Sequence, residues 1–270
     1  MHIDLLDPAT FADGQPVATY DWLRNNDPVH WHEEPGGKGF WALTRYEDVR
    51  AVDRDFQNFS SSPTIMIADG AAAGAGRYKM MLMMDPPDHT AFRRLIRNEF
   101  TLPSAKLRAG RIAELAKQIV DAVIEKGECD FVDDVAGEMP SYVIAELMGL
   151  PLDDGRELYK LTEAIHTAPS AQAPGAGAAA VAKMFEYGSK VMAEKRARPA
   201  DDLASRLLAC EVDGRKLDDM EFLLFFLLLI DAGGDTTRNL LAGGLLALLD
   251  HPDQLAWLRA DLAARLPAAR

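Results

Sequence analysis

The residues of this sequence best suited to chemistry form one short run, Gly233 to Thr237, within a strongly apolar segment. A carboxylate beside a hydroxyl, as in Asp235 and Thr236, can pass protons to a bound ligand. Glycines have no side chain, so a flat ligand can approach the backbone closely. Each glycine costs about 1 kcal/mol relative to alanine inside a helix, which indicates a purpose other than stability.

Each of these residues also has a simpler explanation. A glycine pair in a buried helix is more often a close helix crossing than a cofactor seat, and that alternative stays open. Thr236 alone would be a satisfied core hydroxyl, bonded to the carbonyl of Ala232, and Asp235 alone a paired buried charge. Their combination, shortly after nine apolar residues from Phe222 to Ile230, favours a ligand site.

The element that positions this run is predicted to be one long helix over residues 217–249. Asp218 and Glu221 have the spacing of a capping box at its start, and Asp250-His251-Pro252 marks its end. At 1.5 Å per residue such a helix is roughly 50 Å long. A helix of that length that is apolar on most sides must pass through a core.

A second group of chemically useful residues lies on a helix predicted from Asp85 to about Phe100. His89, Arg93 and Arg97 are spaced four apart and therefore share one helix face. Such a stripe is most often a solvated face. A pair of cations one turn apart also suits the two carboxylates of a single cofactor.

A loop-like stretch over residues 60–87 contains several methionines, which fill irregular apolar space and adapt to varied ligands. We predict that Met66, Met80, Met83 and Ile230 line a hydrophobic substrate pocket. Packing in the core is an equal alternative for any one methionine.

Both motifs resemble those of one family. The run Ala232 to Thr237 resembles the A-G-x-D/E-T-T signature of the long distal helix of cytochrome P-450, the haem-thiolate mono-oxygenases. Met84 to Leu95 resembles the D-P-P-E-H-T-x-x-R-R-L pattern of bacterial members, and residues 129–136 and 143–151 are also similar to the family. The two motifs are far apart in the chain, so they are nearly independent indications.

The resemblance implies an iron-containing oxidoreductase that uses haem b as its cofactor. A lipophilic small molecule would be hydroxylated with O2 and electrons from a ferredoxin-type partner. The stretch from Phe40 to Tyr46 resembles actinobacterial members that oxidise steroids or branched lipids, which implies a substrate of that class. Thr236 would hydrogen-bond the dioxygen, Asp235 would relay protons, and Ala232 and Gly233 would lie over the macrocycle.

The resemblance also implies roles for the helix over residues 85–100. His89 and Arg93 would hold the haem propionates. The exposed arginines Arg94 and Arg97 would help to dock an acidic electron donor.

Two family features are not found in these residues. Neither Cys129 nor Cys210 lies in an F-x-x-G-x-x-x-C-x-G loop, and there is no E-x-x-R helix. We therefore expect residues 1–270 to be a single incomplete cytochrome P-450 domain, the N-terminal part of the fold, with no metal ligand of its own. Such a truncated chain would bind haem weakly or not at all and would be inactive alone. The competing hypothesis is a non-catalytic helical remnant or binding module for an apolar ligand or a protein partner.

Composition sets broader limits. The chain of 270 residues is 48% hydrophobic and 26% charged, with a formal net charge of -13. That charge argues against nucleic acid as a partner. The apolar run is too short for a membrane span, no export signal precedes the first helix, and two cysteines are too few for a disulfide framework. We expect a cytoplasmic protein.

The predicted fold is mainly α with a small β-hairpin over residues 28–32 and 39–44. His30 and His32 of the hairpin are interpreted as an exposed pair rather than a metal site. An extended piece is expected at Cys129 to Val132. Further helices are predicted over residues 16–26, 46–54, 103–126, 136–149, 153–168, 178–196, 201–210 and 252–266.

Overall fold

The computed structural model describes residues 4–64, 67, 80–167 and 173–260, and the chain forms two compact units. Unit 1 comprises Met1–Thr90 and unit 2 comprises Ala91–Arg270. Each unit is described by itself below. The predicted mainly helical fold with small antiparallel sheets is confirmed, while the expectation of a single domain stays a prediction.

Unit 1 is built around an antiparallel hairpin of β1 (Val29–His32) and β2 (Phe40–Leu43), in which Trp31 lies opposite Trp41. The two indole rings meet edge to face with centroids 5.0 Å apart. The remaining elements of the unit are η1 (Pro8–Phe11), α1 (Val17–Asn26), α2 (Tyr46–Arg54) and η2 (Met81–Met83).

The prediction that His30 and His32 form an exposed pair is wrong, because His30 is half-buried and His32 is buried. His32 Nε2 accepts a hydrogen bond from the backbone N–H of Leu5 at 2.9 Å. His30 Nδ1 lies 2.7 Å from Asp27 Oδ2. His32 thus holds Leu5 against the hairpin, whereas His30 contacts the segment just before its own strand.

Unit 2 is a stack of helices. α4 (Asp88–Ile96) crosses the division at Thr90 and continues as η3 (Arg97–Phe100). The elements that follow are α5 (Leu102–Ile124), η4 (Val132–Ala136), α6 (Glu138–Met148), α7 (Leu152–His166), α8 (Ala176–Ala197), α9 (Leu203–Ala209), β3 (Glu211–Val212), β4 (Arg215–Lys216), α10 (Asp219–Asp250) and α11 (Pro252–Ala260).

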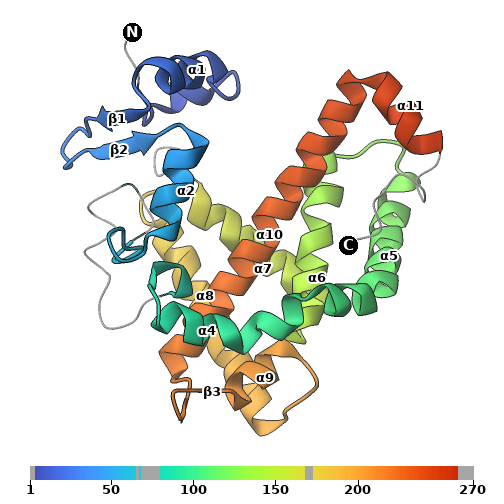
Figure 1. The fold of residues 1–270 in the computed structure, drawn as a ribbon. Coiled ribbons are helices and arrows are strands. Elements are labelled where there is room, and N and C mark those ends of the chain that lie inside the picture. Colours follow the sequence, from blue (N-terminus) through green and yellow to red (C-terminus); the bar gives the residue numbers. More distant parts are fainter. Residues whose placement is uncertain (1–3, 65–66, 68–79, 168–172, 261–270) are drawn as a thin grey trace. The chain divides into compact units, whose positions relative to one another are not determined.

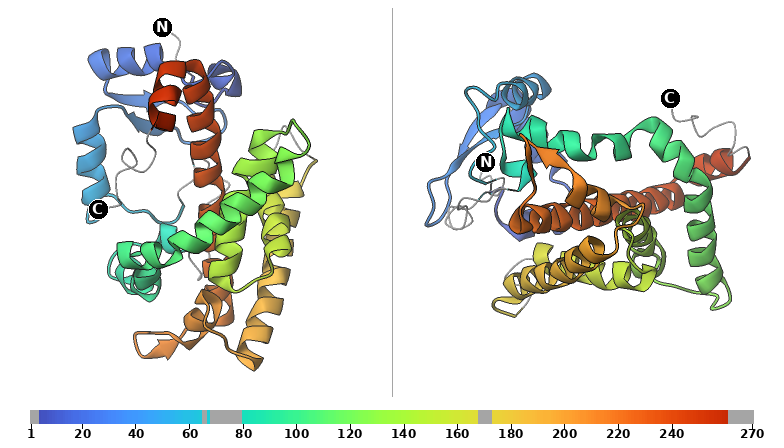
Figure 2. Two further views of the ribbon diagram at one scale, coloured as in Figure 1. Left: turned by 90° about the vertical axis from the view of Figure 1, so that its right-hand side faces the viewer. Right: turned by 90° about the horizontal axis from the view of Figure 1, so that it is seen from below.

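Helix α10 is the centre of unit 2 and contains 32 residues (Figure 1). The predicted capping box is present, because Asp218 accepts from the Glu221 N–H and Glu221 accepts from the Asp218 N–H. Its first half is buried, with Phe222 and Phe226 fully enclosed, and it packs against α6, α7 and α8. Its C-terminal part continues beyond α8 towards α11 (Figure 2).

A buried ion pair ties three helices together beside α10. Lys195 of α8 donates to the Asp202 carboxylate at 2.6 Å and to the Gly149 carbonyl, at the end of α6, at 2.8 Å. Asp202 in turn caps α9 by accepting from the Ser205 N–H. Gly149 has a φ of +71°, and an added Cβ would clash with Asp202, so glycine is required at this turn.

The sequence analysis was wrong about one local element and missed another. The segment expected to be extended at Cys129 to Val132 instead turns into the π-helix η4, because Asp130 accepts hydrogen bonds from the Val132 and Asp133 N–H groups. The β3–β4 hairpin was not predicted. Its signal was the Asp213-Gly214 dipeptide, whose positive φ angles fit a two-residue hairpin turn.

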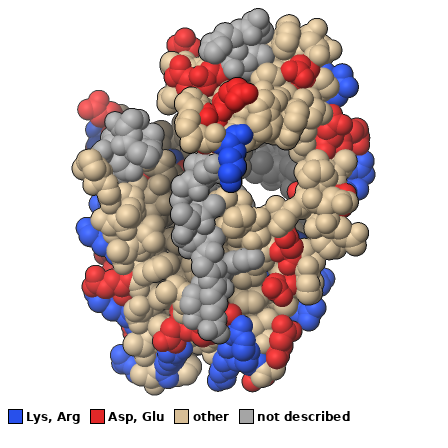
Figure 3. Space-filling model, turned by 90° about the vertical axis from the view of Figure 1, so that its left-hand side faces the viewer, with Lys and Arg blue, Asp and Glu red and all other residues tan. Residues whose placement is uncertain are grey.

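Two further findings concern the distribution of surface charge and the apolar character of the helices. Acidic and basic side chains are interspersed on the face that Figure 3 shows. Among the described residues, no helix is both long enough and apolar enough to cross a membrane.

Candidate functional site

The middle of α10 exposes one face that carries the predicted catalytic hydroxyl. Ala232, Thr236, Leu240 and Gly243 follow each other at three- or four-residue spacing, so they share a side of the helix, and all are exposed or open. The Thr236 hydroxyl donates to the Ala232 carbonyl at 3.4 Å, as the sequence predicts. This face, called the open face below, begins with the small residues Ala232 and Thr236.

The glycines next to this face pack against other helices. A Cβ added at Gly233 would lie 3.3 Å from Ile144 of α6, and one added at Gly234 would lie 3.0 Å from the Tyr159 ring of α7. The close helix crossing left open by the sequence is therefore real. A role of Gly233 in cofactor binding stays a prediction.

The Asp235 carboxylate has partners on both oxygens. Its Oδ1 accepts from Arg238 at 2.7 Å and its Oδ2 from the Asn239 amide at 3.1 Å. Arg238 also donates to Glu163 of α7 at 2.6 Å. The candidate proton carrier is thus held in a charged network and only partly exposed.

Tyr159 completes this network from α7. Its hydroxyl donates to Glu163 at 3.3 Å, and its ring lies under the Arg238 guanidinium, 5.5 Å from carbon to centroid. Burial and the negative charge of Glu163 raise the pKa of the Tyr159 hydroxyl, so it remains a donor at neutral pH. A further contact between the same helices joins His166 and Asp231 at 2.7 Å.

Arg238 and Glu163 were missed by reasoning from the sequence. Arg238 was detectable in principle, since it follows Asp235 by three residues on a predicted helix. Glu163 comes from a helix 75 residues away in sequence, so only the fold reveals it.

The predicted propionate anchors His89 and Arg93 both lie on α4, one turn apart. Phe92, next to Arg93, is buried and stacks on Phe225 of α10 with ring centroids 5.7 Å apart, which fixes this part of α4 on the central helix.

Arg93 is exposed and, within the described part of the chain, has no ion-pair partner. Arg94 and Arg97 are exposed as well.

The predicted pocket residues are not assembled by any described contact. Met66 lies outside the described residues, and Met80 and Met83 are half-buried in unit 1. Ile230 of unit 2 is 2% exposed and belongs to the helical core. Their role in a substrate pocket stays a prediction.

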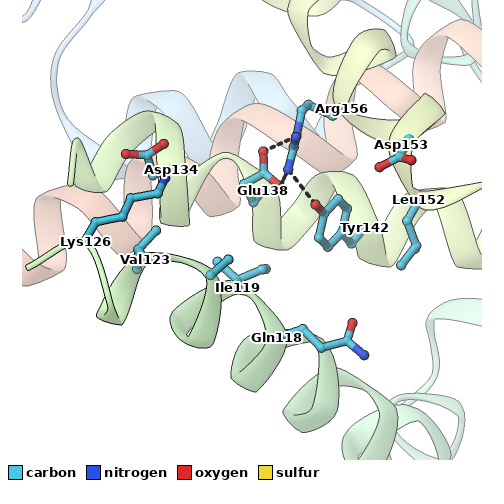
Figure 4. A pocket seen from close by; sticks show the side chains of 11 residues that line it. Gln118, Ile119, Val123, Lys126, Asp134, Glu138, Tyr142, Leu152, Asp153 and Arg156 are labelled. Carbon is cyan, nitrogen blue, oxygen red and sulfur yellow. Dashed lines mark hydrogen bonds and ion pairs between the residues drawn. The ribbon is translucent and has the colours of Figure 1, made fainter. Parts of the chain in front are cut away.

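A cavity of about 410 Å³ lies elsewhere, between α5, α6 and α7 (Figure 4). Arg156 faces Glu138 and Tyr142 there, donating to the tyrosine hydroxyl at 2.7 Å and pairing with the carboxylate. Ile119 and Val123 form the opposite wall. No predicted site residue lines this cavity, so we place the candidate site on α10.

Neither cysteine belongs to α10. Cys129 is exposed in the segment before η4, and Cys210 follows α9. Burial raises the pKa of the Cys210 thiol, which favours the neutral form over a metal-binding thiolate.

Comparisons with known proteins decide the family. No family model matches the chain. The chain is 35% identical over 289 aligned residues to the putative cytochrome P450 126 of Mycobacterium tuberculosis, covering 99% of this chain and 68% of that protein. The chain belongs to the cytochrome P450 family.

Other relatives support the same family assignment. The steroid C26-monooxygenase of Mycobacterium tuberculosis is 34% identical over 272 residues, covering 93% of this chain. The solved structure of Mycobacterium marinum cytochrome P450 CYP268A2 in complex with pseudoionone superposes with a TM-score of 0.85 at 32% identity, covering 98% of this chain and 69% of that one. The chain spans 61% of the length of the steroid C26-monooxygenase that it matches.

The open face of this cytochrome P450 chain fits a flat macrocycle. A Cβ added at Gly243 or Gly244 would meet no atom within 4 Å, and Ala232 is exposed, so small residues leave the helix backbone accessible at these positions. The apolar Leu240, 73% exposed, borders the same surface. A porphyrin would bury such groups, which otherwise face water.

Proposed function

We propose that this chain supplies the distal side of a haem-dependent mono-oxygenase that hydroxylates a lipophilic small molecule. The observation that carries the proposal is the open face of α10, where the Thr236 hydroxyl is exposed and bonded to the Ala232 carbonyl, in a chain of the cytochrome P450 family. When bound, the haem iron supplies the activation of O2 and the oxidation of the substrate.

Ala232 and Gly233 are the residues we assign to the haem surface. With small residues at these positions, the backbone of α10 can approach a planar ring. His89 and Arg93 would hold the two propionates through charge-assisted hydrogen bonds, since both lie on one side of α4. We assign haem b on the resemblance to the family.

Thr236 and Asp235 are assigned to proton handling. The Thr236 hydroxyl can rotate from the Ala232 carbonyl towards a ligand on the open face and donate its hydrogen there. Asp235 is the neighbouring carboxylate and remains partly open to solvent, so it can replace the proton that Thr236 gives up.

The substrate class is inferred from relatives and from the apolar border of the site. One relative is named a steroid C26-monooxygenase, and a solved relative holds pseudoionone. A steroid or branched lipid is the substrate class that we propose. The electron donor would be a ferredoxin-type protein in the cytoplasm, and the exposed Arg94 and Arg97 suit an acidic partner.

Within residues 1–270 we expect weak haem binding and no oxygen activation, because neither cysteine stands in a haem-ligand loop. The test is a fusion in which the part of cytochrome P450 126 beyond the aligned region follows this chain. After haem loading, the carbon monoxide difference spectrum should show a thiolate-ligated haem. A folded fusion that takes up no haem would support the alternative, a helical module that binds an apolar ligand or a protein.

The role of Thr236 is tested in the same fusion by comparing Thr236→Ala with Thr237→Ala. Both remove an exposed hydroxyl from adjacent positions of α10. We expect Thr236→Ala to lower the yield of hydroxylated product per O2 consumed by roughly tenfold or more, and Thr237→Ala to leave it unchanged. Equal effects of the two substitutions would refute the assignment.

A further inference from the structure

We propose that Arg238 and Glu163 are positioning residues that fix the Asp235 carboxylate on α10. The inference rests on the proposed function, in which Asp235 supplies protons. Neither residue touches the open face, so neither is assigned to the chemistry itself.

The Arg238 guanidinium forms ion pairs with two carboxylates at once. One terminal nitrogen of Arg238 binds Asp235 Oδ1 at 2.7 Å, and the other binds Glu163 Oε1 at 2.6 Å. Asp235 and Glu163 belong to different helices, so the guanidinium links the candidate proton carrier to α7. The second Asp235 oxygen accepts from Asn239, which settles the rotation of the carboxylate.

The guanidinium cannot easily move away from this position. Its side chain is 19% exposed, and the Tyr159 ring lies against one face of it. Tyr159 reaches this place because Gly234 leaves room for its ring on α10. The Tyr159 hydroxyl also donates a hydrogen bond to Glu163, so the Glu163 carboxylate is fixed as well.

An arginine is needed for this arrangement. Its planar fork offers separate donors to two carboxylates at once, whereas a lysine ammonium is a compact point charge on a flexible stem. Arg238→Lys thus keeps the charge but is expected to lose one of the two ion pairs. Without the bond to Glu163, Asp235 and Arg238 would form only a pair three residues apart on one helix, and such a pair does not connect the carboxylate to α7.

The test follows the Asp235 side-chain carboxyl carbon by NMR in the 270-residue chain labelled with 13C-aspartate, with the signal assigned from Asp235→Asn. Glu163 makes no direct bond to Asp235, so a shift of this signal in Glu163→Gln reports transmission through Arg238. The matched control is Glu157→Gln, which removes a carboxylate of the same helix that pairs with Lys160 at 2.9 Å. We expect the signal to shift in Glu163→Gln and Arg238→Lys and to stay in place in the control.

A signal that Glu163→Gln leaves in place would overturn the proposal. A second readout uses the haem-loaded fusion, where Glu163→Gln and Arg238→Lys should lower product per O2 roughly tenfold while substrate affinity is unchanged. If the NMR signal shifts but Asp235→Asn itself leaves product per O2 unaltered, the proton role of Asp235 fails while the positioning of its carboxylate stands. If Asp235→Asn lowers the yield but the two positioning variants do not, the functional part of this proposal is refuted.

Discussion

At the scale of single residues, both neighbouring glycines of α10 lie where another helix packs closely, while the haem role of Gly233 stays a prediction. The sequence favoured a ligand site for the run as a whole, and the helix crossing was the alternative for the glycines. Gly233 and Gly234 face Ile144 and Tyr159, while Ala232 and Thr236 point to the open face. A one-dimensional motif does not separate these roles, because consecutive helical residues point in directions about 100° apart.

Substituting glycines of the same helix by alanine tests this distinction. Gly244→Ala places a methyl group in open space and should raise the free energy of unfolding by about 1 kcal/mol through helix propensity. Gly234→Ala gains the same propensity, but its methyl group would lie 3.0 Å from the Tyr159 ring. We therefore expect Gly234→Ala to have a lower free energy of unfolding in urea than Gly244→Ala. Equal stabilisation by both would show that Tyr159 does not pack closely on α10.

At the scale of elements, most helices were predictable because their ends carry local signals. The Asp218–Glu221 capping box and the Asp250-His251-Pro252 end gave α10 to within two residues of its observed bounds. The π-helix η4 was not predictable, since its turns depend on the Asp130 side chain rather than on periodicity. Contacts between helices, such as that of Lys195 with Asp202, also have no sequence signal.

The Lys195–Asp202 pair should be a major stabilising contact between α8 and α9. In Lys195→Met the Asp202 carboxylate stays buried without its cation, which we expect to cost about 3 kcal/mol or more. The matched control is Lys190→Met on the same helix, where the pair with Glu186 is exposed. Its unfolding midpoint should match that of the parent chain. A small loss in Lys195→Met would mean that the pair is not buried in solution.

The same pair predicts a pH dependence. Burial raises the pKa of Asp202, but hydrogen bonds from Lys195 and Ser205 outweigh it, so the pKa lies below the ordinary value of 3.8. A depressed folded-state pKa adds stability above the unfolded value, and that stability is lost as the pH falls through the folded value. Stability should therefore decline below pH 3.8 more steeply in the parent chain than in Asp202→Asn. If urea unfolding at acid pH shows the same loss of stability in the parent chain and in Asp202→Asn, this pH dependence is refuted.

At the scale of the whole molecule, the family and its helical architecture could be predicted because two separated motifs agreed. The 35% identity to a cytochrome P450 confirms that prediction. The division at Thr90 could not be predicted, because it cuts through the His89–Arg93 motif within a continuous helix. The predicted methionine pocket stays a prediction, since Met80 and Met83 belong to unit 1 and Ile230 to unit 2.

The central claim is that the open face of α10 at Ala232 receives the haem. The most direct test compares haem uptake by the fusion carrying Ala232→Trp with that of the fusion carrying Ala247→Trp. Both alanines are exposed on α10, roughly 22 Å apart along the helix. We predict that Ala232→Trp prevents haem uptake and abolishes the thiolate carbon monoxide spectrum, while Ala247→Trp retains both. Full haem uptake by a folded Ala232→Trp protein would contradict the claim.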